Sequence, residues 1–224
     1  MTPLLAIIVP VLNEAKNLPA LLSHLLPFHG RGVEIILVDG GSTDESVSII
    51  RGSPFKLVIS ERGRGKQMNA GARSSSAENL LFLHADTRLP DNADIRITSS
   101  LLTRHWGRFD VHIAGSHPLL KVIAFMMNWR SRLTGVSTGD QAIFMKRSAY
   151  DLVLGFPSQM LMEDIAISRE LKQLSRPVCI DEKVYTSGRR WNEYGVWRTI
   201  TLMWRLRFFY WLGTDPNILA ERYK

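Results

Sequence analysis

Hydrophobic residues in the first part of the chain gather in four short runs. The runs cover residues 4–11, 33–41, 55–60 and 79–86 and are rich in leucine, isoleucine and valine. The first two and the fourth end in or next to proline, glycine or aspartate. Continuous apolar runs of this length are typical of strands that are buried on both faces of a parallel sheet. The pattern therefore predicts four buried strands.

Three helices are predicted between these strands. Leucines recur at helical spacing within residues 13–28, and a second helix is expected over residues 42–52. The second helix is predicted to open with a capping box between Ser42 and Glu45. A third helix is expected over residues 65–75. Strands and helices that alternate in this way predict an α/β fold, with a mostly parallel central sheet and helices on both faces.

The pattern changes in the second half of the chain. In residues 107–115 apolar side chains alternate with polar ones, which is typical of an edge strand or an antiparallel strand. Helices are expected over residues 117–135 and 162–174, and a further strand over residues 140–147. We therefore expect a single domain over residues 1–190, in which residues 1–90 bind a nucleotide and residues 91–190 bind a second ligand. Residues 191–224 form a separate aromatic and basic tail in this interpretation.

Composition and charge narrow the classes of partner. The chain has 224 residues, which is enough for one domain with a full core. Its single cysteine, Cys179, excludes an internal disulfide and fits a reducing, cytoplasmic compartment. We find no secretory signal and no apolar stretch long enough to span a bilayer. A formal net charge of +7 favours phosphorylated ligands, nucleic acid or an anionic membrane surface as partners.

Polar residues at the ends of the predicted strands indicate a binding site. In open parallel sheets, ligands bind beyond the carboxyl ends of the strands. Glu14 follows the first strand, Asp39 lies at the end of the second, and Asp86 ends the fourth. A glycine-rich loop brings Arg64 and Lys66 to the same edge. Because like charges gathered in one place repel each other, a divalent cation together with a diphosphate would balance this collection.

Each of these residues also has a simpler structural explanation. Asn13 is a good helix N-cap, and Glu14 would be favourable in the first turn of the helix that follows. Asp39 precedes two glycines and could shape a turn, and Asp86 could cap the next segment. Their coincidence at one edge of the sheet favours a site.

Five sequence blocks resemble a known family when they are taken in order. They are "IIVPVLNEAKNL", "ILVDGGSTDES", "GRGKQMNAGA", "LFLHADT" and "GDQAIFMKRSAYDLVLGFPSQMLMEDIAISREL", and together they cover roughly residues 4–175. They resemble the successive motifs of the family 2 inverting glycosyltransferases, which have the GT-A fold. The "LHADT" block is similar to that of a short branch, the arsenosugar-biosynthesis-type enzymes. The resemblance implies metal-dependent transfer of one sugar from a nucleoside-diphosphate sugar, with a UDP-sugar as the first candidate, to an unidentified hydroxyl acceptor.

The resemblance also implies roles at the donor site. Asp86 matches the carboxylate that binds Mn²⁺ or Mg²⁺ on the diphosphate. His84 stands where the family usually has aspartate, and it either ligates Mn²⁺ or hydrogen-bonds the ribose or a phosphate. Asp39 matches the residue against the base and Glu14 the residue near the ribose, although Gly40 replaces the acid that usually follows Asp39. The implied donor-binding set is Pro10, Asn13, Glu14, Asp39, Arg64, Lys66, His84 and Asp86.

The remaining motifs imply the catalytic and acceptor residues. Asp164 resembles the general base that takes the proton of the acceptor hydroxyl, and Glu163 would orient the acceptor or brace the loop. For a carboxylate pair in the first turn of a helix, the structural alternative is a favourable interaction with the helix dipole. Asp140 and Gln141 would line the sugar or acceptor pocket, or would form a turn that leads into a strand.

The sequence "SGRRWNEYG" is similar to an element of processive family members. Arg190 and Trp191 could contact the diphosphate and the acceptor, but Ser187 replaces the expected glutamine, so we predict a single transfer.

The tail is rich in aromatic and basic residues. Residues 196–213 carry Arg198, Arg205 and Arg207 among tryptophans and phenylalanines, a composition that suits a helix lying in a membrane interface. The alternative is a helix packed on the domain, with its arginines extended towards water. No nucleic-acid motif is present, so nucleic acid is not an expected partner. Two competing functions remain, a sugar-1-phosphate nucleotidylyltransferase and a non-catalytic adaptor at the membrane surface.

Overall fold

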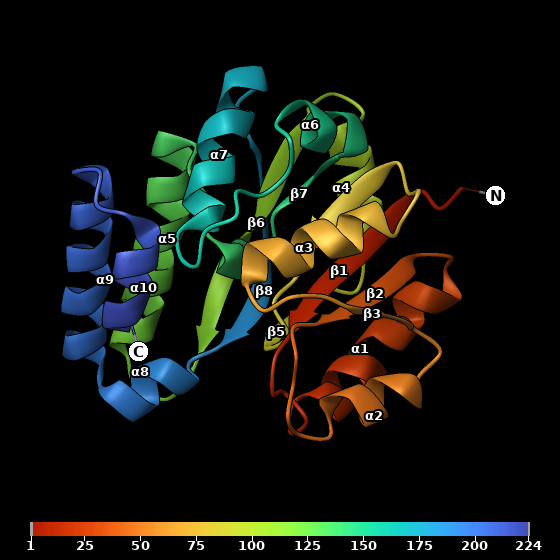
Figure 1. Cartoon of the computed structure of the whole chain (residues 1–224). Helices are drawn as coiled ribbons and strands as arrows, with labels where there is room; N and C mark the ends of the chain where they lie inside the picture. The colour runs from red at the N-terminus through yellow and green to blue at the C-terminus, as the bar shows by residue number, and fades with distance from the viewer. Residues whose placement is uncertain (1, 224) are drawn as a thin grey trace.

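The computed structural model describes residues 2–223, and its centre is one mixed sheet (Figure 1). The strands are β1 (Leu5–Val11), β2 (Glu34–Asp39), β3 (Lys56–Ile59), β4 (Asn79–Phe82), β5 (Thr87–Arg88), β6 (Trp106–Ala114), β7 (Phe144–Lys146) and β8 (Val178–Ser187). They lie side by side in the order β3-β2-β1-β4-β7-β6-β8-β5. The sheet confirms the predicted α/β fold.

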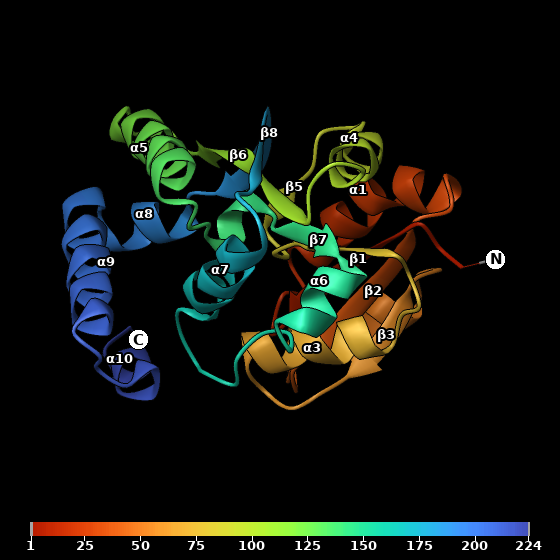
Figure 2. The same ribbon diagram turned by 90° about the horizontal axis from the view of Figure 1, so that it is seen from above.

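Helices cover both faces of the sheet. They are α1 (Leu18–Gly30), α2 (Ser46–Arg51), α3 (Arg64–Arg73), α4 (Ala93–Leu101), α5 (Leu119–Thr134), α6 (Arg147–Leu152), α7 (Glu163–Leu174), α8 (Arg189–Tyr194), α9 (Val196–Trp211), α10 (Pro216–Tyr223) and the short 3₁₀ turn η1 (Gly139–Gln141). Seen from above, α1, α4 and α5 lie on one side of the sheet, and α3, α6 and α7 lie on the other (Figure 2).

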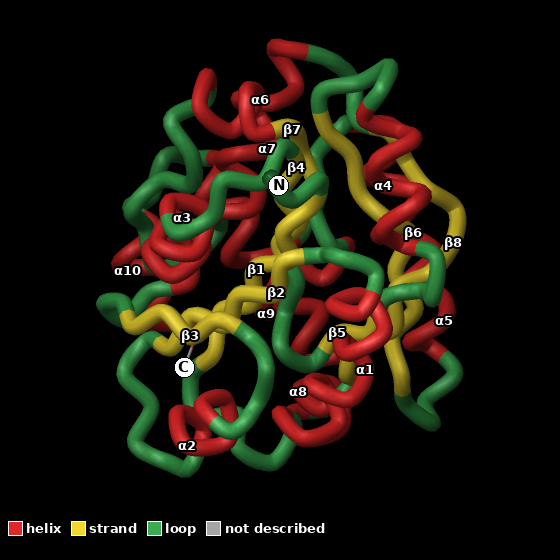
Figure 3. Tube along the Cα trace, turned by 90° about the vertical axis from the view of Figure 1, so that its right-hand side faces the viewer, coloured by secondary structure: helices red, strands yellow, loops and turns green. Residues whose placement is uncertain are grey.

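The two halves of the sheet differ in strand direction. In the first half, β3, β2, β1 and β4 are all parallel, and Val11 at the end of β1 pairs with Asp39 at the end of β2. In the second half, β7 runs antiparallel to both β4 and β6, while β6 runs parallel to β8. The long strands β6 and β8 lie side by side in Figure 3. The parallel half therefore brings the carboxyl ends of β1, β2 and β4 to one edge.

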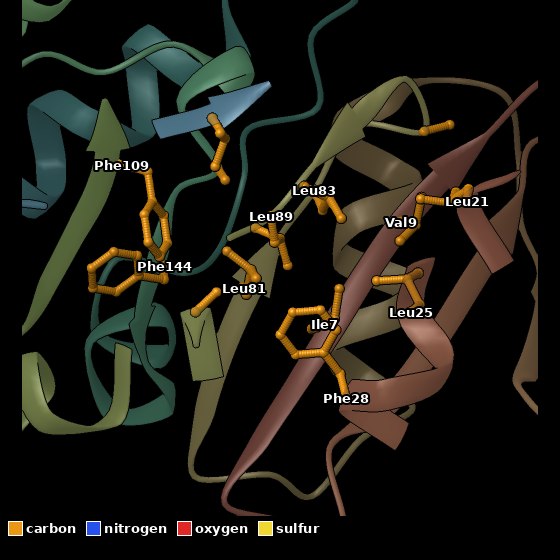
Figure 4. Packing of buried hydrophobic residues seen from close by; sticks show 14 of the residues in the cluster. Ile7, Val9, Leu21, Leu25, Phe28, Leu81, Leu83, Leu89, Phe109 and Phe144 are labelled. Atoms are coloured by element: carbon orange, nitrogen blue, oxygen red, sulfur yellow. The ribbon is translucent and has the colours of Figure 1, made fainter. Parts of the chain in front are cut away.

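Alternate residues of β1 serve two separate cores. Ile7 and Val9 point to the side of α1, where Ile7 lies near Phe28 (Figure 4), and Ala6 and Ile8 belong to the core on the other side. All five of these side chains are 0–1% exposed. Burying a large apolar side chain contributes roughly 1.5–3 kcal/mol, so continuous apolar strands stabilise both layers at once.

Two predicted helix starts are wrong. The helix α1 begins at Leu18, so Asn13 is not its N-cap and Glu14 is not in its first turn. The helix α2 begins at Ser46, and the predicted capping box between Ser42 and Glu45 does not form. Instead, Ser42 Oγ accepts a hydrogen bond from the backbone N–H of Asn13. Ser42, which was expected at the start of α2, thus joins the loop after β2 to the loop after β1.

The strand β6 is antiparallel to β7, which confirms one of the two predicted alternatives, but it lies inside the sheet and not at its edge. Its neighbours are β7 and β8, and Phe109, Val111 and Ile113 are all buried. The alternation of the sequence was interpreted correctly as a strand, but the polar partners are also enclosed. Arg108 is fully buried and pairs with Asp110. The sequence of a buried strand that contains an ion pair can therefore show the same alternation of polar and apolar residues as a half-exposed strand.

The C-terminal helices pack on the rest of the domain at the start of α7. Leu206 of α9 and Leu219 of α10 form a small core with Met162 and Ile165. Side chains of α9 and α10 therefore contact the first turn of α7 and the residue before it. Within residues 2–223, no helix combines the length and the hydrophobicity needed to cross a bilayer.

Candidate functional site

A small pocket lies beyond the end of β4, between elements from both halves of the chain. Its lining consists of Met68, Phe82, His84, Gly139, Ile143, Phe156, Glu163 and Asp164. Its volume is about 10 Å³, which is room for a single water molecule. The pocket in this conformation therefore has no room for a ligand larger than a water molecule.

The turn η1 connects His84 to Asp164. His84 Nδ1 lies 3.2 Å from Asp140 Oδ1, and the backbone N–H of Gly139 donates a 2.8 Å hydrogen bond to Asp164 Oδ2. A Cβ atom on Gly139 would overlap the His84 ring, so position 139 needs glycine. Both ring nitrogens of His84 thus face η1, and the ring positions this turn.

Asp164 lies at the start of α7, after a strained residue. Met162, the N-cap, has φ 65° and ψ 20°, a left-handed conformation that L-residues rarely adopt. Such a backbone costs about 1–3 kcal/mol and persists where the surroundings enforce it, often at functional sites. Asp164 Oδ1 accepts the N–H of Ile165 at 2.8 Å. The carboxylate is therefore held at the pocket by a donor on each oxygen.

Glu163 is buried and links α7 to α3. Its side chain is 2% exposed, and its Oε1 lies 3.2 Å from Nη1 of Arg64. Burial raises the pKa of Glu163; the positive charge of Arg64 works against this shift, and the negative charge of Asp164 adds to it. The close approach of the two elements depends on Gly65, because a Cβ there would lie 2.8 Å from the carbonyl oxygen of Pro157.

Asp140 lies among positive groups. Burial works against ionisation of its carboxylate, but the hydrogen bond to His84 and the charges of Arg64 and Arg207 outweigh it and lower the pKa of Asp140. Its side chain is 45% exposed, so solvent screens these interactions.

Two arginines approach Asp164 from helices that the sequence did not connect with it. Burial and the nearby Arg207 lower the pKa of Arg130 in α5 to about 10, against the opposing effect of Asp164. Burial also lowers the pKa of Arg207 in α9, and the charges of Asp164 and Asp140 oppose this shift. Arg130 carries no signal in the sequence that connects it with the site, and Arg207 belongs to the residues predicted to form the tail.

Asp39 has one oxygen available to a ligand. The side chain is 2% exposed, and its Oδ2 accepts the N–H groups of Gly41 at 2.8 Å and Ser42 at 3.0 Å. Its Oδ1 is buried and has no hydrogen-bond partner among residues 2–223. A buried acceptor without a donor is costly, so this oxygen suits an N–H group of a ligand.

Gln67 is a site residue that sequence reasoning missed. Its side chain is 4% exposed, and its Nε2 donates to the carbonyl oxygens of Val11 and Val38, each at 2.8 Å. The amide thereby joins the ends of β1 and β2 to α3. A Cβ on Gly40 would lie 2.8 Å from the Gln67 side chain. Glycine at position 40, where the resembling family usually has an acid, is therefore explained by Gln67.

Asp86 follows β4 as predicted but does not line the small pocket. Its Oδ1 accepts one long hydrogen bond, 3.4 Å from the Thr87 hydroxyl. Among residues 2–223 no three His, Cys, Asp or Glu side chains are grouped to hold a metal. Mg²⁺ commonly binds through one or two carboxylates together with substrate phosphates. The carboxylate of Asp86, with its one long hydrogen bond among the described residues, suits a metal that is bound partly by substrate phosphates. A metal enclosed by protein ligands alone does not match the described residues.

Three predicted donor residues take structural roles at the sheet edge. Asn13 has φ 54°, and its Oδ1 accepts the backbone N–H of Thr43 at 2.8 Å. Glu14 Oε1 lies 3.5 Å from Nη2 of Arg189. Pro10 lies within β1, paired with β2. These side chains lie at the predicted edge, but they do not line the pocket.

Four other predicted residues also lie away from the pocket lining. Lys66 forms a 2.6 Å ion pair with Glu61 near the surface. Gln141 is fully buried and caps η1, which matches the alternative of a turn leading into a strand. The guanidinium of Arg190 stacks on a tyrosine ring in α8, and Trp191 packs against the main core. Of the predicted acceptor residues, the structure brings Asp140 alone next to the pocket.

Solved structures with the same architecture define the class. The chain superposes over its whole length on 70% of the mannosyltransferase PcManGT from Pyrobaculum calidifontis in complex with GDP-Man and Mn²⁺, with a TM-score of 0.70 and 20% identity. It also matches TarS residues 1–349 of Staphylococcus aureus in complex with UDP, with a TM-score of 0.67 and 18% identity over 84% of this chain and 60% of that one. The fold is that of a GT-A glycosyltransferase.

Sequence comparison then gives the family. The chain belongs to glycosyl transferase family 2, whose profile matches residues 6–148. A relative is the PGL/p-HBAD biosynthesis glycosyltransferase of Mycobacterium bovis, which is 33% identical over 110 residues, 46% of this chain. The chain spans 43% of that relative's length. Membership of this family favours a glycosyltransferase over the nucleotidylyltransferase and the adaptor, while the resemblance to the arsenosugar-type branch stays a prediction.

Proposed function

We propose that this chain transfers one sugar from a nucleoside-diphosphate sugar to an acceptor hydroxyl, with inversion at the anomeric carbon. The observation that carries the proposal is the pocket shared by His84 and Asp164. It joins the exit of β4, which continues to Asp86, to the first turn of α7. The predicted donor edge and the predicted base therefore meet across one small space.

Uridine is the first candidate for the base. Asp39 Oδ1 is a buried acceptor at the end of β2, without a partner among the described residues. The N3–H of uracil is a suitable donor, and guanine also presents N–H groups on its pairing edge. Both nucleotides occur in similar folds, since TarS was solved with UDP and PcManGT with GDP-Man. A comparison of UDP with GDP decides between them.

Asp86 is the residue that would hold a divalent metal, Mn²⁺ or Mg²⁺. Among residues 2–223, its carboxylate accepts one long hydrogen bond, from the Thr87 hydroxyl. When bound, the metal would stabilise negative charge on the diphosphate leaving group. His84 contacts Asp140 and Gly139, so we assign it to holding η1 and not to the metal.

Asp164 is the proposed general base. It lies in the first turn of α7, and its carboxylate lines the pocket. In the proposed step, the acceptor oxygen forms a bond to the anomeric carbon while the bond from that carbon to the diphosphate oxygen breaks. The hydroxyl proton passes to Asp164, and the nucleoside diphosphate leaves. An in-line displacement of this kind inverts the anomeric configuration, and base catalysis is commonly worth about 10²–10⁴-fold.

We also propose a cytoplasmic enzyme that binds peripherally to the inner face of an anionic membrane. The exposed tryptophans of α9, including Trp197 at 70% and Trp204 at 73%, support this location, and so does the absence of acidic residues from the helix.

Calorimetric titration with UDP, with and without Mn²⁺, tests the donor site. We expect the wild-type chain to bind UDP much more tightly when Mn²⁺ is present. In Asp86→Ala the dependence on Mn²⁺ should disappear, because the carboxylate that holds the metal is gone. The matched variant Asp91→Ala, an exposed aspartate just beyond β5, should behave like the wild type. Unchanged metal dependence in Asp86→Ala would refute the role of Asp86.

A further inference from the structure

Arg130 and Arg207 form a pair of cationic side chains beside the proposed base. Arg130 comes from α5 and Arg207 from α9, and each lies close enough to Asp164 for their charges to interact. The packing of Leu206 and Leu219 on Met162 and Ile165 brings α9 to this position. Two helices that are far apart in sequence thus place positive side chains near Asp164.

Two donors of Arg130 are not used by the described residues. Nε and Nη2 of Arg130 are buried and have no hydrogen-bond partner among residues 2–223. Within the same part of the chain, neither Arg130 nor Arg207 forms a salt bridge. A buried polar group without a partner costs about 1–3 kcal/mol, and more when it is charged. The two cations also repel each other, so an anion placed between them would relieve both penalties.

The location of the pair points to the acceptor side of the site. Arg207 lies near Asp164 and Asp140, which belong to α7 and η1. The basic residue near Asp86, by contrast, is Arg88. The general base must contact the acceptor hydroxyl, so an anion bound beside Asp164 belongs to the molecule that carries this hydroxyl.

We propose that Arg130 and Arg207 bind an oxyanion of the acceptor, so that the acceptor is an alcohol carrying a phosphate or a carboxylate near its reactive hydroxyl. This inference rests on the proposed function, because it takes Asp164 as the base. Guanidinium groups bind such anions through paired N–H donors, which also fixes the orientation of the bound group. The pair would thereby align the hydroxyl with Asp164.

Inorganic phosphate serves as the probe, titrated into the protein that is already saturated with UDP and Mn²⁺. Occupying the donor site first prevents phosphate from binding there. We expect phosphate to bind the wild type and to bind Arg130→Gln or Arg207→Gln at least tenfold more weakly, because a charge-assisted hydrogen bond is lost in each. Arg130→Lys keeps the positive charge but lacks the paired N–H donors of a guanidinium group, so its affinity for phosphate should be intermediate. The control Arg205→Gln removes an exposed arginine of the same helix and should bind phosphate like the wild type.

Two further titrations separate the explanations. UDP affinity should be unchanged in all four variants, and thermal unfolding checks that each one folds. Short-chain phosphatidic acid that binds more tightly than phosphate would indicate a lipid acceptor, and equal binding would indicate a soluble one; both outcomes support the inference.

The inference fails if UDP binds but phosphate does not, if phosphate competes with UDP, or if Arg130→Gln and Arg207→Gln leave phosphate affinity unchanged. If UDP itself does not bind, the proposed function fails separately. The phosphate titration without nucleotide then still tests the arginine pair, by the same comparison of variants.

Discussion

Two glycines shape the site because other groups of the protein lie very close to their backbone. The His84 ring lies against Gly139, and the start of α3 lies against the carbonyl of Pro157 at Gly65. Any larger residue at either glycine would push apart groups that line the pocket. These two glycines therefore set the distances among His84, Glu163 and Asp164, although neither takes part in chemistry.

Buried Glu163 makes stability depend on pH in a defined direction. Burial raises the pKa of Glu163 above its ordinary value of 4.5, with Arg64 opposing the shift and Asp164 adding to it. The folded state therefore holds the proton more tightly than the unfolded chain does. The stabilisation from the protonated form is complete below about pH 4.5 and is lost as the pH rises through the folded-state pKa.

Urea unfolding of the wild type and of Glu163→Gln between pH 4 and pH 8 measures this effect. The glutamine side chain is neutral at every pH, so the free energy of unfolding of the wild type should fall relative to the variant as the pH rises. Glu170→Gln, an exposed glutamate in the same helix, should run parallel to the wild type. A constant difference between the wild type and Glu163→Gln would show that Glu163 does not titrate abnormally.

Residues at strand ends could be predicted, but residues delivered by distant packing could not. Asp39 lies at the end of β2 as expected, because the carboxyl end of a buried strand is readable from the sequence. Gln67 and Arg130 carried no local signal, since their roles depend on contacts with β2 and with α7. Arg207 follows the buried Leu206 on α9, but the sequence alone did not say which element that face would meet.

At the scale of elements, apolar periodicity predicted the strands and most helices, but the predicted starts of the helices were less accurate. The helix α1 starts at Leu18 because the residues before it are held by the loop after β2, where Asn13 exchanges hydrogen bonds with Ser42 and Thr43. The inner position of β6 could not be predicted, because the ion pair of Arg108 and Asp110 makes a buried strand look half polar.

The helices α5 and α9 together present an aromatic and basic surface, which we call the α5–α9 surface. It contains Phe125, Trp129, Trp197, Trp204, Phe208 and Trp211, each 52–73% exposed. Both helices lie at the same end of the molecule (Figures 1 and 2), and neither contains an acidic residue. A groove of about 610 Å³ beside α5 adds Lys121, Arg132 and Lys183. This composition matches the interface of an anionic membrane.

Vesicle sedimentation tests the α5–α9 surface. We expect the protein to bind vesicles that contain phosphatidylglycerol and to bind pure phosphatidylcholine weakly. A basic residue near an anionic surface is worth about 1 kcal/mol, so the double variant Arg198→Gln/Arg205→Gln should bind roughly thirtyfold more weakly. Arg51→Gln/Arg73→Gln loses the same charge from α2 and α3 and should bind normally. Equal loss in both double variants would show that net charge, and not this surface, governs binding.

At the scale of the whole molecule, the site lies where two differently built halves of the chain meet. The parallel half supplies Asp39, Gln67, His84 and Asp86. The mixed half supplies η1 and α7, and the C-terminal helices add Arg207. The sequence predicted that Asp39, His84 and Asp86 follow strand ends because parallel strands share one edge, but it did not predict Gln67. It did not place Arg130 or Arg207 beside Asp164, because the approach of α5, α7 and α9 is a long-range outcome of packing.

The most direct measurement is the rate at which the protein releases nucleoside diphosphate from UDP-sugars and GDP-mannose with Mn²⁺, water acting as a slow acceptor. The wild type should release UDP. Asp164→Asn should lower kcat by about 10²–10⁴-fold, or about 3–5 kcal/mol, with UDP affinity unchanged, because removing the base leaves the donor site intact. An Asp164→Asn variant that turns over at the wild-type rate would contradict the account.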